Sequence, residues 1–484
     1  MKKHLFWLAA LALGMAACTT DPNGPEGPKG PEDDNTTPVA SAQLIELKAD
    51  QSRLLTPGAS LAATSAADAE NNGAWLEGPK YLQSVEGGES KDVSHKYSAT
   101  GLAFNGNTLY ISWHSNRKAD LDEDSEDHQH GTNVDGDSEP SLDSADDWGG
   151  IVDVITIDPS DITKLECTKL YLQPEHKYNH VLYADNNLYL ASTSWFVGAA
   201  LHVIPTTATG LTTSEAERFS LTGNSANCAV KVGDEIVTIS GRTEGGLNWF
   251  NPATADTDQS KASVNATTAN FGGKHIYVDG NKVYTLRNPQ APVIEVYDAE
   301  SKSVETFATV SGNEDDTDFG LLPIDGKNVL AGDENYIYAC CGQYGLHIYD
   351  KATGEKVASS HKNIAENKNA KPWQKYYTAN GVDVDDNYVY VANGAGLVIL
   401  EKNFDNLNQY GGLKLKKYAQ FTGTVDFTFN NRSGNDNTEE GQLKESSNFV
   451  KLYTNGDKHY AFVAYGMYGL RIYDLSELYP AVEE

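Results

Sequence analysis

The fold is decided by a short unit that recurs along the chain, most clearly as Gly345–Asp350 (GLHIYD) and Gly469–Asp474 (GLRIYD). Apolar and polar residues alternate in both copies, which is the pattern of a half-buried β-strand. Further copies begin with the apolar residues Ile151, Leu201, Leu247, Val293 and Leu397. Successive copies are 46 to 53 residues apart, except for a last step of 73. A fixed period of this length indicates a repeat architecture.

A second strand-like segment precedes each copy of the unit. These segments are Thr108–Trp113, Asn187–Ala191, Glu235–Ile239, Lys282–Leu286, Tyr336–Cys340, Tyr388–Ala392 and His459–Ala464. Most follow an Asp/Asn/Gly turn, such as Asn105–Asn107 or Asp279–Asn281, and such turns join antiparallel strands. Seven units of this size predict an all-β protein: a seven-bladed β-propeller of four-stranded antiparallel blades.

The two ends of the repeat region predict how the propeller closes. The last unit has room for only three strands before Glu484, whereas Lys80–Glu86 (KYLQSVE) is strand-like and has no unit of its own. We expect this N-terminal strand, at about residues 80–86, to complete the last blade, which would remove a free sheet edge. Residues 73–484 are therefore predicted to form one domain, with the polar insertion 422–447 as a surface loop.

The first residues have the features of an export signal. Lys2 and Lys3 precede an apolar stretch, Leu5–Met15, and the small residues Ala16 and Ala17 follow. This order is typical of a signal peptide, here residues 1–17. The apolar stretch is too short for a membrane-spanning helix, which needs about 20 residues. Residues 18–72 are rich in Pro, Gly and acidic residues at their start and are predicted to form a flexible tether.

Two parts of the chain resemble a known family. Gly14–Cys18 (GMAAC) resembles the lipobox of bacterial lipoproteins, and the recurring strand, as in Leu397–Leu400, resembles the LVIVD repeat of β-propeller lipoproteins of Bacteroidetes type. The resemblance implies cleavage before Cys18, diacylation of that cysteine, and attachment to the outer membrane. It leaves open whether the protein faces the periplasm or lies on the cell surface. It brings no catalytic residues with it.

The charge of the chain limits its partners. With 37 basic and 68 acidic residues, the formal net charge is −31, which makes nucleic-acid binding unfavourable and leaves membrane attachment to the lipid anchor alone. We expect a monomer. Besides Cys18, the cysteines are Cys167, Cys228, Cys340 and Cys341. Four are too few for a disulfide framework, so we expect small buried residues with at most one bridge.

The loops predicted to surround the channel mouth are rich in aromatic residues. Residues that we predict to contact a ligand are Trp113, His114, Trp195, Tyr344, Trp373, Tyr465, Tyr468, Arg242 and Arg287. Exposed Trp and Tyr side chains stack on sugar rings or contact proteins. The alternative, of equal weight, is that these aromatic residues only cap the ends of the sheets. The arginines and the histidine would bind a ligand carboxylate, or else serve as local counter-charges.

An acidic insertion, residues 118–147, carries a weak metal-binding pattern. Asp120, Asp122 and Asp124 have the spacing of a calcium loop, and His128 and His130 lie close behind. The Gly and Glu that complete such a loop are missing, so a solvated charged loop is favoured over a Ca²⁺ site. No cofactor is required by the sequence.

Enzyme motifs are mostly missing, which favours a non-catalytic protein. His114, His180, His275 and Arg287 are the set that would gather at the channel mouth of an enzyme, and Asp383 and Asp385 are a weaker carboxylate pair. We expect a cell-envelope lipoprotein whose loop face binds a protein or glycan. The alternative is a propeller enzyme, a lyase, lactonase or hydrolase-like protein, that acts on an extracellular carbohydrate or lactone.

Overall fold

The structure of the chain is a computed structural model. The structure describes residues 44–47, 49, 51–55, 75–76, 97–115, 149–162, 164–174, 176–194, 198–223, 225–241, 244–251, 263–269, 271–288, 292–310, 327–342, 345–359, 379–393, 396–402, 413–420, 424–430, 438–444, 447–466 and 469–479. Cys18 and the predicted signal peptide lie outside these residues.

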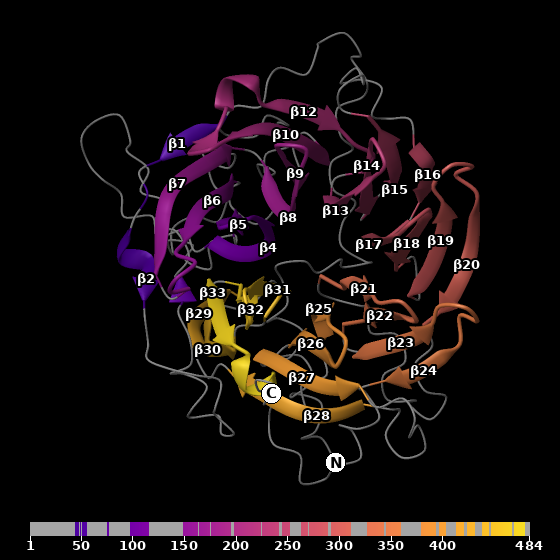
Figure 1. The fold of residues 1–484 in the computed structure, drawn as a ribbon. Helices are drawn as coiled ribbons and strands as arrows, with labels where there is room; N and C mark the ends of the chain where they lie inside the picture. The colour runs from indigo at the N-terminus through magenta and orange to yellow at the C-terminus, as the bar shows by residue number, and fades with distance from the viewer. Residues whose placement is uncertain are drawn as a thin grey trace.

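The described chain is all-β, as predicted, and its sheets are antiparallel. Figure 1 shows the sheets arranged around a common centre. The helical segments in the described residues are short 3-10 turns at Gln51–Arg53, Thr213–Glu215 and Ser476–Leu478. Within the described residues, no helix has the length and apolar character needed to cross a membrane.

The first sheet has the order β1-β7-β6-β5-β4, and a larger sheet follows it. The strands of the first sheet are β1 (Ile45–Leu47), β4 (Tyr97–Asn105), β5 (Thr108–Ser115), β6 (Gly149–Ile157) and β7 (Leu165–Pro174). The larger sheet contains β8 (Lys177–Ala184), β9 (Asn187–Thr193), β10 (Ala200–Thr207), β11 (Gly210–Leu211), β12 (Glu217–Ser220), β13 (Ser225–Val232), β14 (Glu235–Gly241), β15 (Glu244–Phe250) and β16 (Ser263–Ala269). Two repeat units share this sheet because Ser225 of β13 pairs with Thr193 of β9.

Three four-stranded sheets come next, each in sequence order. The first of them contains β17 (Gly273–Asp279), β18 (Lys282–Arg287), β19 (Val293–Asp298) and β20 (Val304–Thr309). The second contains β21 (Leu330–Gly332), β22 (Tyr336–Cys340), β23 (Leu346–Asp350) and β24 (Lys356–Ser359). The third contains β25 (Ala379–Val384), β26 (Tyr388–Asn393), β27 (Gly396–Lys402) and β28 (Leu413–Gln420).

The last sheet has the order β2-β3-β33-β32-β31 and combines both ends of the described chain. Its strands are β2 (Leu54–Leu55), β3 (Trp75–Leu76), β31 (Phe449–Asn455), β32 (Lys458–Ala464) and β33 (Leu470–Asp474). A separate hairpin consists of β29 (Thr424–Asn430) and β30 (Thr438–Lys444).

The strands predicted from the repeat are confirmed. The recurring unit forms β6, β10, β15, β19, β23, β27 and β33, and each pairs antiparallel with the strand predicted before it. The turns use positive φ as expected: Gly106 and Gly280, between inner strands and their partners, have φ of 54° and 56°. The described cysteines Cys167, Cys228, Cys340 and Cys341 are buried, and none forms a disulfide.

Three predicted boundaries differ from the structure. The insertion 422–447 is not a loop throughout, because it contains the hairpin β29–β30. The segment TVDFTFN forms β29 and pairs with β30 although both strands contain many polar residues. The strand beside β33 is β3, at Trp75–Leu76, whereas residues 80–86 lie outside the described residues. The predicted tether 18–72 contains β1, which pairs with β7, so its later part is packed on the folded body.

The core lies between successive sheets. The largest apolar cluster joins the first sheet, the β21–β24 sheet, the β25–β28 sheet and the last sheet, and it includes Trp113, Ile348 and Phe462. In Figure 1, β4, β8, β13, β17, β21, β25 and β31 are the strands nearest the centre. Along this series each strand contacts the next, and β31 also contacts β4. We call these seven the inner strands.

Candidate functional site

The inner strands share one irregularity where they face the centre. Five of them have a register shift that leaves one extra residue relative to the partner strand. The extra residues are Thr100, Asn179, Asn227, Lys274 and Asn380. In the two remaining units Asn328 and Asn448 occupy the matching place in the sequence. Such β-bulges change the direction in which side chains point.

At five of these seven positions the side chain bonds its inner strand to the next one. In every case the acceptor is the carbonyl oxygen of the residue just before the next extra residue. The bonds are Thr100 Oγ1 to Tyr178 O (2.8 Å), Asn179 Nδ2 to Ala226 O (2.8 Å), Asn227 Nδ2 to Gly273 O (2.6 Å), Asn380 Nδ2 to Ser447 O (2.8 Å) and Asn448 Nδ2 to Ala99 O (3.1 Å). The last of them joins the C-terminal inner strand to the first one.

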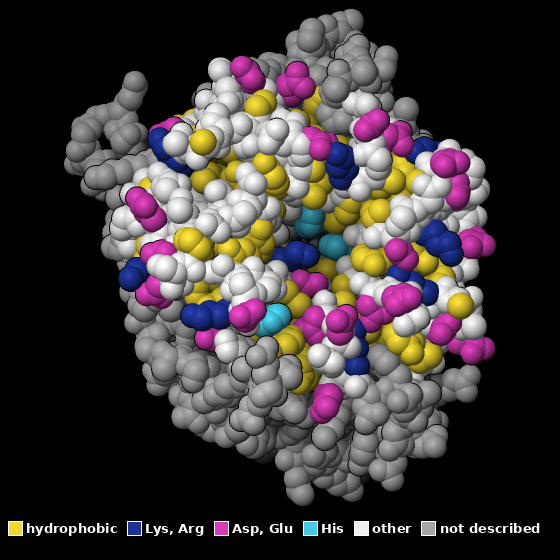
Figure 2. Space-filling view, viewed as in Figure 1, with side chains coloured by type: hydrophobic (Ala, Val, Ile, Leu, Met, Phe, Trp, Pro, Cys, Tyr) yellow, Lys and Arg dark blue, Asp and Glu magenta, His cyan; other side chains and the backbone are white. Residues whose placement is uncertain are grey.

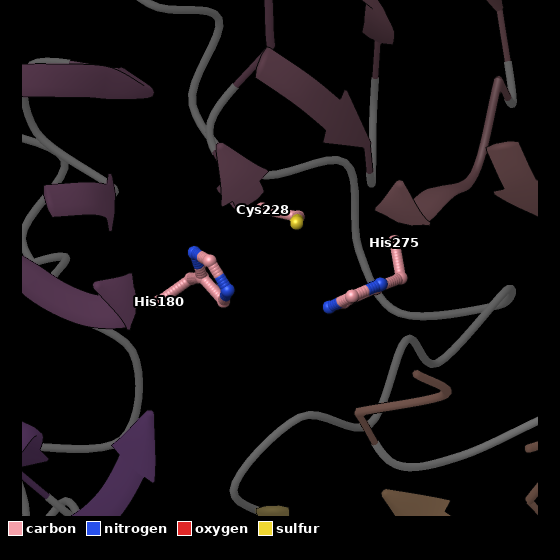
Figure 3. Close-up of side chains that lie close together, drawn as sticks. All are labelled: His180, Cys228 and His275. Atoms are coloured by element: carbon pink, nitrogen blue, oxygen red, sulfur yellow. The ribbon is translucent and has the colours of Figure 1, made fainter. Parts of the chain in front are cut away.

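The residue after the extra one places a titratable side chain at the centre on three successive inner strands. These are His180 on β8, Cys228 on β13 and His275 on β17, which we call the central triad. Figure 3 shows the three side chains converging. Their ligand atoms lie within 4.8 Å of one another, and the two imidazole centroids are 5.7 Å apart. Cys228 and His275 are buried, whereas His180 as a whole residue keeps partial exposure.

Each member of the triad accepts a backbone N–H from the following inner strand. Ala229 N donates to His180 Nδ1 (3.4 Å), and Leu330 N donates to His275 Nδ1 (3.2 Å). The backbone N–H of Ile276 bonds to the Cys228 thiol in the same way. These bonds assign the imidazole tautomer, because a nitrogen that accepts a hydrogen bond carries no proton. The proton of each neutral imidazole is therefore on Nε2.

Burial keeps the triad uncharged. Burial first, and then the positive charges of Lys327 and Lys451, lower the pKa of His180 from 6.5 to about 3. The pKa of His275 is also well below 6.5, through burial first and then His180 and the same two lysines. Burial raises the pKa of the Cys228 thiol to about 12. At neutral pH the site contains two neutral imidazoles and a protonated thiol.

Two lysines supply positive charge beside the triad. Lys327 Nζ donates to the backbone carbonyl of Asn179 (3.0 Å), the residue next to His180. Lys451 Nζ lies 3.6 Å from Asp383 Oδ2, and Asp383 also accepts the backbone N–H of Leu452 (2.8 Å). Figure 2 shows that the molecule is hollowed at the centre, with histidine and Lys or Arg side chains at the bottom of the hollow.

The triad does not suit a metal ion in this arrangement. Among the described residues it is the one group of three or more His, Cys, Asp or Glu side chains close enough to share an ion, and its N and S atoms are of the kind that zinc prefers. However, both Nδ1 lone pairs accept hydrogen bonds, and metal ligation requires deprotonated donors. The nearby lysines would also repel a cation. The triad presents hydrogen-bond donors to the centre.

The structure buries three of the residues predicted to contact a ligand. Trp113 and Tyr465 are 0 % exposed and His114 is 2 % exposed. Tyr465 Oη lies 2.9 Å from Tyr473 Oη and accepts the backbone N–H of Leu397. Trp113 and Tyr465 belong to the apolar core and so offer no exposed aromatic surface to a ligand.

Arg287 uses its charge within the protein. Its guanidinium pairs with the carboxylate of Glu295, with Nε 2.8 Å from Oε2, and donates to Phe271 O (3.1 Å). The other predicted contact and metal residues lie outside the described residues; they are Trp195, Arg242, Tyr344, Trp373 and Tyr468, and Asp120, Asp122, Asp124, His128 and His130.

The structure brings together only some of the residues predicted to gather at the channel mouth of an enzyme. His180 and His275 meet at the centre, whereas His114 and Arg287 do not join them. Asp385 accepts backbone N–H bonds from Asn387 and Tyr388 (2.8 Å each) and so stabilises its own turn. Cys228 was expected only as a small buried residue. Its place after Asn227, matching that of His180 after Asn179, is the sequence signal that would have revealed its position.

Comparisons with known proteins identify no relative by sequence. No family model matches, and no curated protein matches. A solved structure of the computationally designed protein Ika8 is similar to the chain with a TM-score of 0.38 and 10% identity, covering 82% of this chain and 100% of that one. A chain in a crystal structure of the mitotic checkpoint complex has a TM-score of 0.47 and 9% identity, covering 78% of this chain and 89% of that one.

Proposed function

We propose that the chain is a seven-bladed β-propeller of four-stranded antiparallel blades, each built on one inner strand. The contact of β31 with β4 and the bond from Asn448 to Ala99 support closure of the ring. The pairing of β3 with β33 supports an N-terminal strand as the outer strand of the last blade. Closure of this kind leaves no exposed edge at the point where first and last blades meet.

The proposed location follows from the N-terminal sequence. The signal-like segment before Cys18, and its likeness to a lipobox, support cleavage and lipidation at this cysteine. The protein would then be attached to the outer membrane by lipid, because two acyl chains suffice for stable anchoring. A Cys18→Ala variant is expected to lose incorporation of labelled palmitate and to leave the membrane fraction. Retention of both label and membrane attachment would contradict lipidation at Cys18.

We propose that the protein binds a protein or glycan partner without catalysis and that the partner contacts the central hollow. The observation that carries this proposal is the central triad, in which His180 and His275 converge at the centre and carry Nε2–H donors. Catalysis of proton transfer would require a base with a pKa near neutrality. Burial holds the pKa of His180 at about 3, which favours binding over the alternative of a lyase, lactonase or hydrolase-like enzyme.

Affinity capture and a glycan array with the mature chain test this function. We expect the wild type to retain a partner or glycan and a His180→Asn/His275→Asn double variant to lose it. His202→Asn is the matched control, because His202 is fully buried away from the triad, beside Tyr178. Retention of the partner by the double variant would contradict a central site. Turnover of a lactone or polysaccharide that depends on the triad would favour the enzyme.

A further inference from the structure

The central triad has a hydrogen-bond donor that the described protein does not use. His275 is 8 % exposed, and its Nε2 has no hydrogen-bond partner among the described residues. Since Nδ1 accepts from Leu330 N, this Nε2 carries a proton. A buried donor without an acceptor is destabilising because it has lost its hydrogen bonds to water, so a site that retains one is suited to a ligand that supplies the acceptor.

We propose that His180, Cys228 and His275, together with Lys327 and Lys451, bind an oxyanion group of a ligand: a carboxylate, sulfate or phosphate. The site is the one in the proposed function, and the inference rests on that function only for the molecule that carries the oxyanion group. The imidazoles donate through Nε2, and the lysines supply the positive charge.

The spacing of the triad suits an oxygen acceptor. Its N and S atoms lie within 4.8 Å of one another. One oxygen atom can accept from two donors at this separation with hydrogen bonds of about 2.8 Å. The three side chains occupy the same position on successive inner strands, so their directions are fixed by the sheets and their bulges. The donors are therefore oriented before a ligand arrives.

Two lysines lie beside the triad in a molecule that is acidic overall. The chain as a whole has a net charge of −31. At the triad, by contrast, the positive charges of Lys327 and Lys451 act on both imidazoles, and Asp383 Oδ2 lies 3.6 Å from Lys451 Nζ. Hydrogen bonds to a charged acceptor are stronger than neutral ones, especially where water is excluded. An oxyanion would thus satisfy the donors and the local positive charge together.

Titration of the purified mature chain with sulfate tests the proposal. We expect one sulfate per chain by calorimetry and a change in the Nε2 resonances of His180 and His275 in long-range ¹H–¹⁵N spectra. Sulfate does not titrate between pH 5.5 and 8 and the imidazoles stay neutral, so the affinity should be constant over this range. A steep rise in affinity below pH 6.5 would show binding by imidazolium and overturn the proposed donor arrangement.

Two variants of His275 distinguish the loss of its Nε2 hydrogen-bond donor from a general effect on folding. In His275→Asn the amide oxygen takes the place of Nδ1 and keeps the bond from Leu330 N, while the Nε2 donor is lost. We expect about a tenfold or greater loss of sulfate affinity, the value of one hydrogen bond to a charged group. In His275→Gln the amide nitrogen lies near Nε2, so part of the affinity should remain. His202→Asn is the control and should bind sulfate like the wild type.

Parallel titrations with acetate, phosphate and Zn²⁺ identify the ligand class. Binding of acetate or phosphate that competes with sulfate supports the site. The relative affinities then show whether a planar carboxylate or a tetrahedral oxyanion binds more tightly. Stoichiometric Zn²⁺ binding that is lost in Cys228→Ser would overturn the proposal, as would silence with all three anions. Failure of partner capture with sulfate binding intact would contradict the proposed function alone. Partner capture without anion binding would contradict this inference alone.

Discussion

Buried histidines are the residues whose chemistry the fold changes most. His176, His180, His202 and His275 all have pKa values below the ordinary 6.5, because burial disfavours the imidazolium ion. At His176 and His202 Arg218 adds to this effect, and at His180 and His275 Lys327 and Lys451 do so. All four imidazoles are therefore neutral in the folded protein at pH 7 and below.

This neutrality predicts a loss of stability in mild acid. The unfolded chain protonates its histidines below pH 6.5 while the folded chain does not, so the free energy of unfolding decreases as the pH falls. Each buried histidine contributes about 1.4 kcal/mol per pH unit in the lower part of this window. Urea unfolding at intervals between pH 7.5 and 5 measures the slope.

Two variants test how much of this pH dependence of the free energy of unfolding comes from the triad. His275→Asn should reduce it by one histidine's share, since asparagine does not titrate. Cys228→Ser is the control from the same site, because the pKa of its thiol, about 12, lies far outside the window. A slope that His275→Asn leaves unchanged would show that this imidazole is already protonated in the folded protein.

At the scale of elements, lysines just after the recurring strand join neighbouring sheets. Lys351 Nζ binds Asp279 Oδ2 (2.7 Å) of the preceding sheet, and Lys402 Nζ binds Asp333 Oδ2 (2.7 Å) in the same way. Asp333 also accepts from Tyr338 Oη (2.5 Å) and from backbone N–H groups of its own turn. The carboxylate thus holds a turn, a strand and the next sheet together.

Removal of one such lysine should weaken the contact between sheets. The side chain of Lys402 is 9 % exposed, so Lys402→Met leaves Asp333 without its cation and should lower the free energy of unfolding by about 1–3 kcal/mol. Lys164, whose side chain is 69 % exposed and which pairs with Asp161 at 3.4 Å, is the matched control, and its change to Met should cost about 0.5 kcal/mol or less. Equal effects of both substitutions in urea unfolding would contradict a structural role for Lys402.

At the scale of the molecule, the N-terminal segment spans the point where the first and last sheets meet. Strand β1 pairs with β7 of the first sheet, and β3 pairs with β33 of the last. Between them Arg53 forms a buried pair with Asp153, at 2.7 Å and 3.0 Å, and Gln51 bonds to the backbone of Cys167. The segment expected to be a tether therefore fastens two sheets that are far apart in sequence.

Stepwise truncation of the mature chain tests this role. Removal of residues 18–43, which precede β1, gives the reference variant whose stability the longer truncations are compared with. Removal of residues 18–56 leaves Asp153, which is 0 % exposed, without Arg53 and should cost about 3–5 kcal/mol. Removal of residues 18–78 also exposes the edge of β33 and should cause self-association, visible in light scattering after size exclusion. A monomer of unchanged stability after the longest truncation would contradict the closure proposed here.

The sequence alone determined the all-β class and the position of the repeated strands, because alternation and turn residues act over a few neighbours. It could not determine which side chains meet. His180, Cys228 and His275 lie on separate repeat units, and only the packing of inner strands, with a bulge before each residue, brings them together. Packing also buried Trp113 and Tyr465 and drew residues 44–55 onto the first and last sheets. These outcomes depend on contacts between distant segments, which the local pattern of a sequence does not contain.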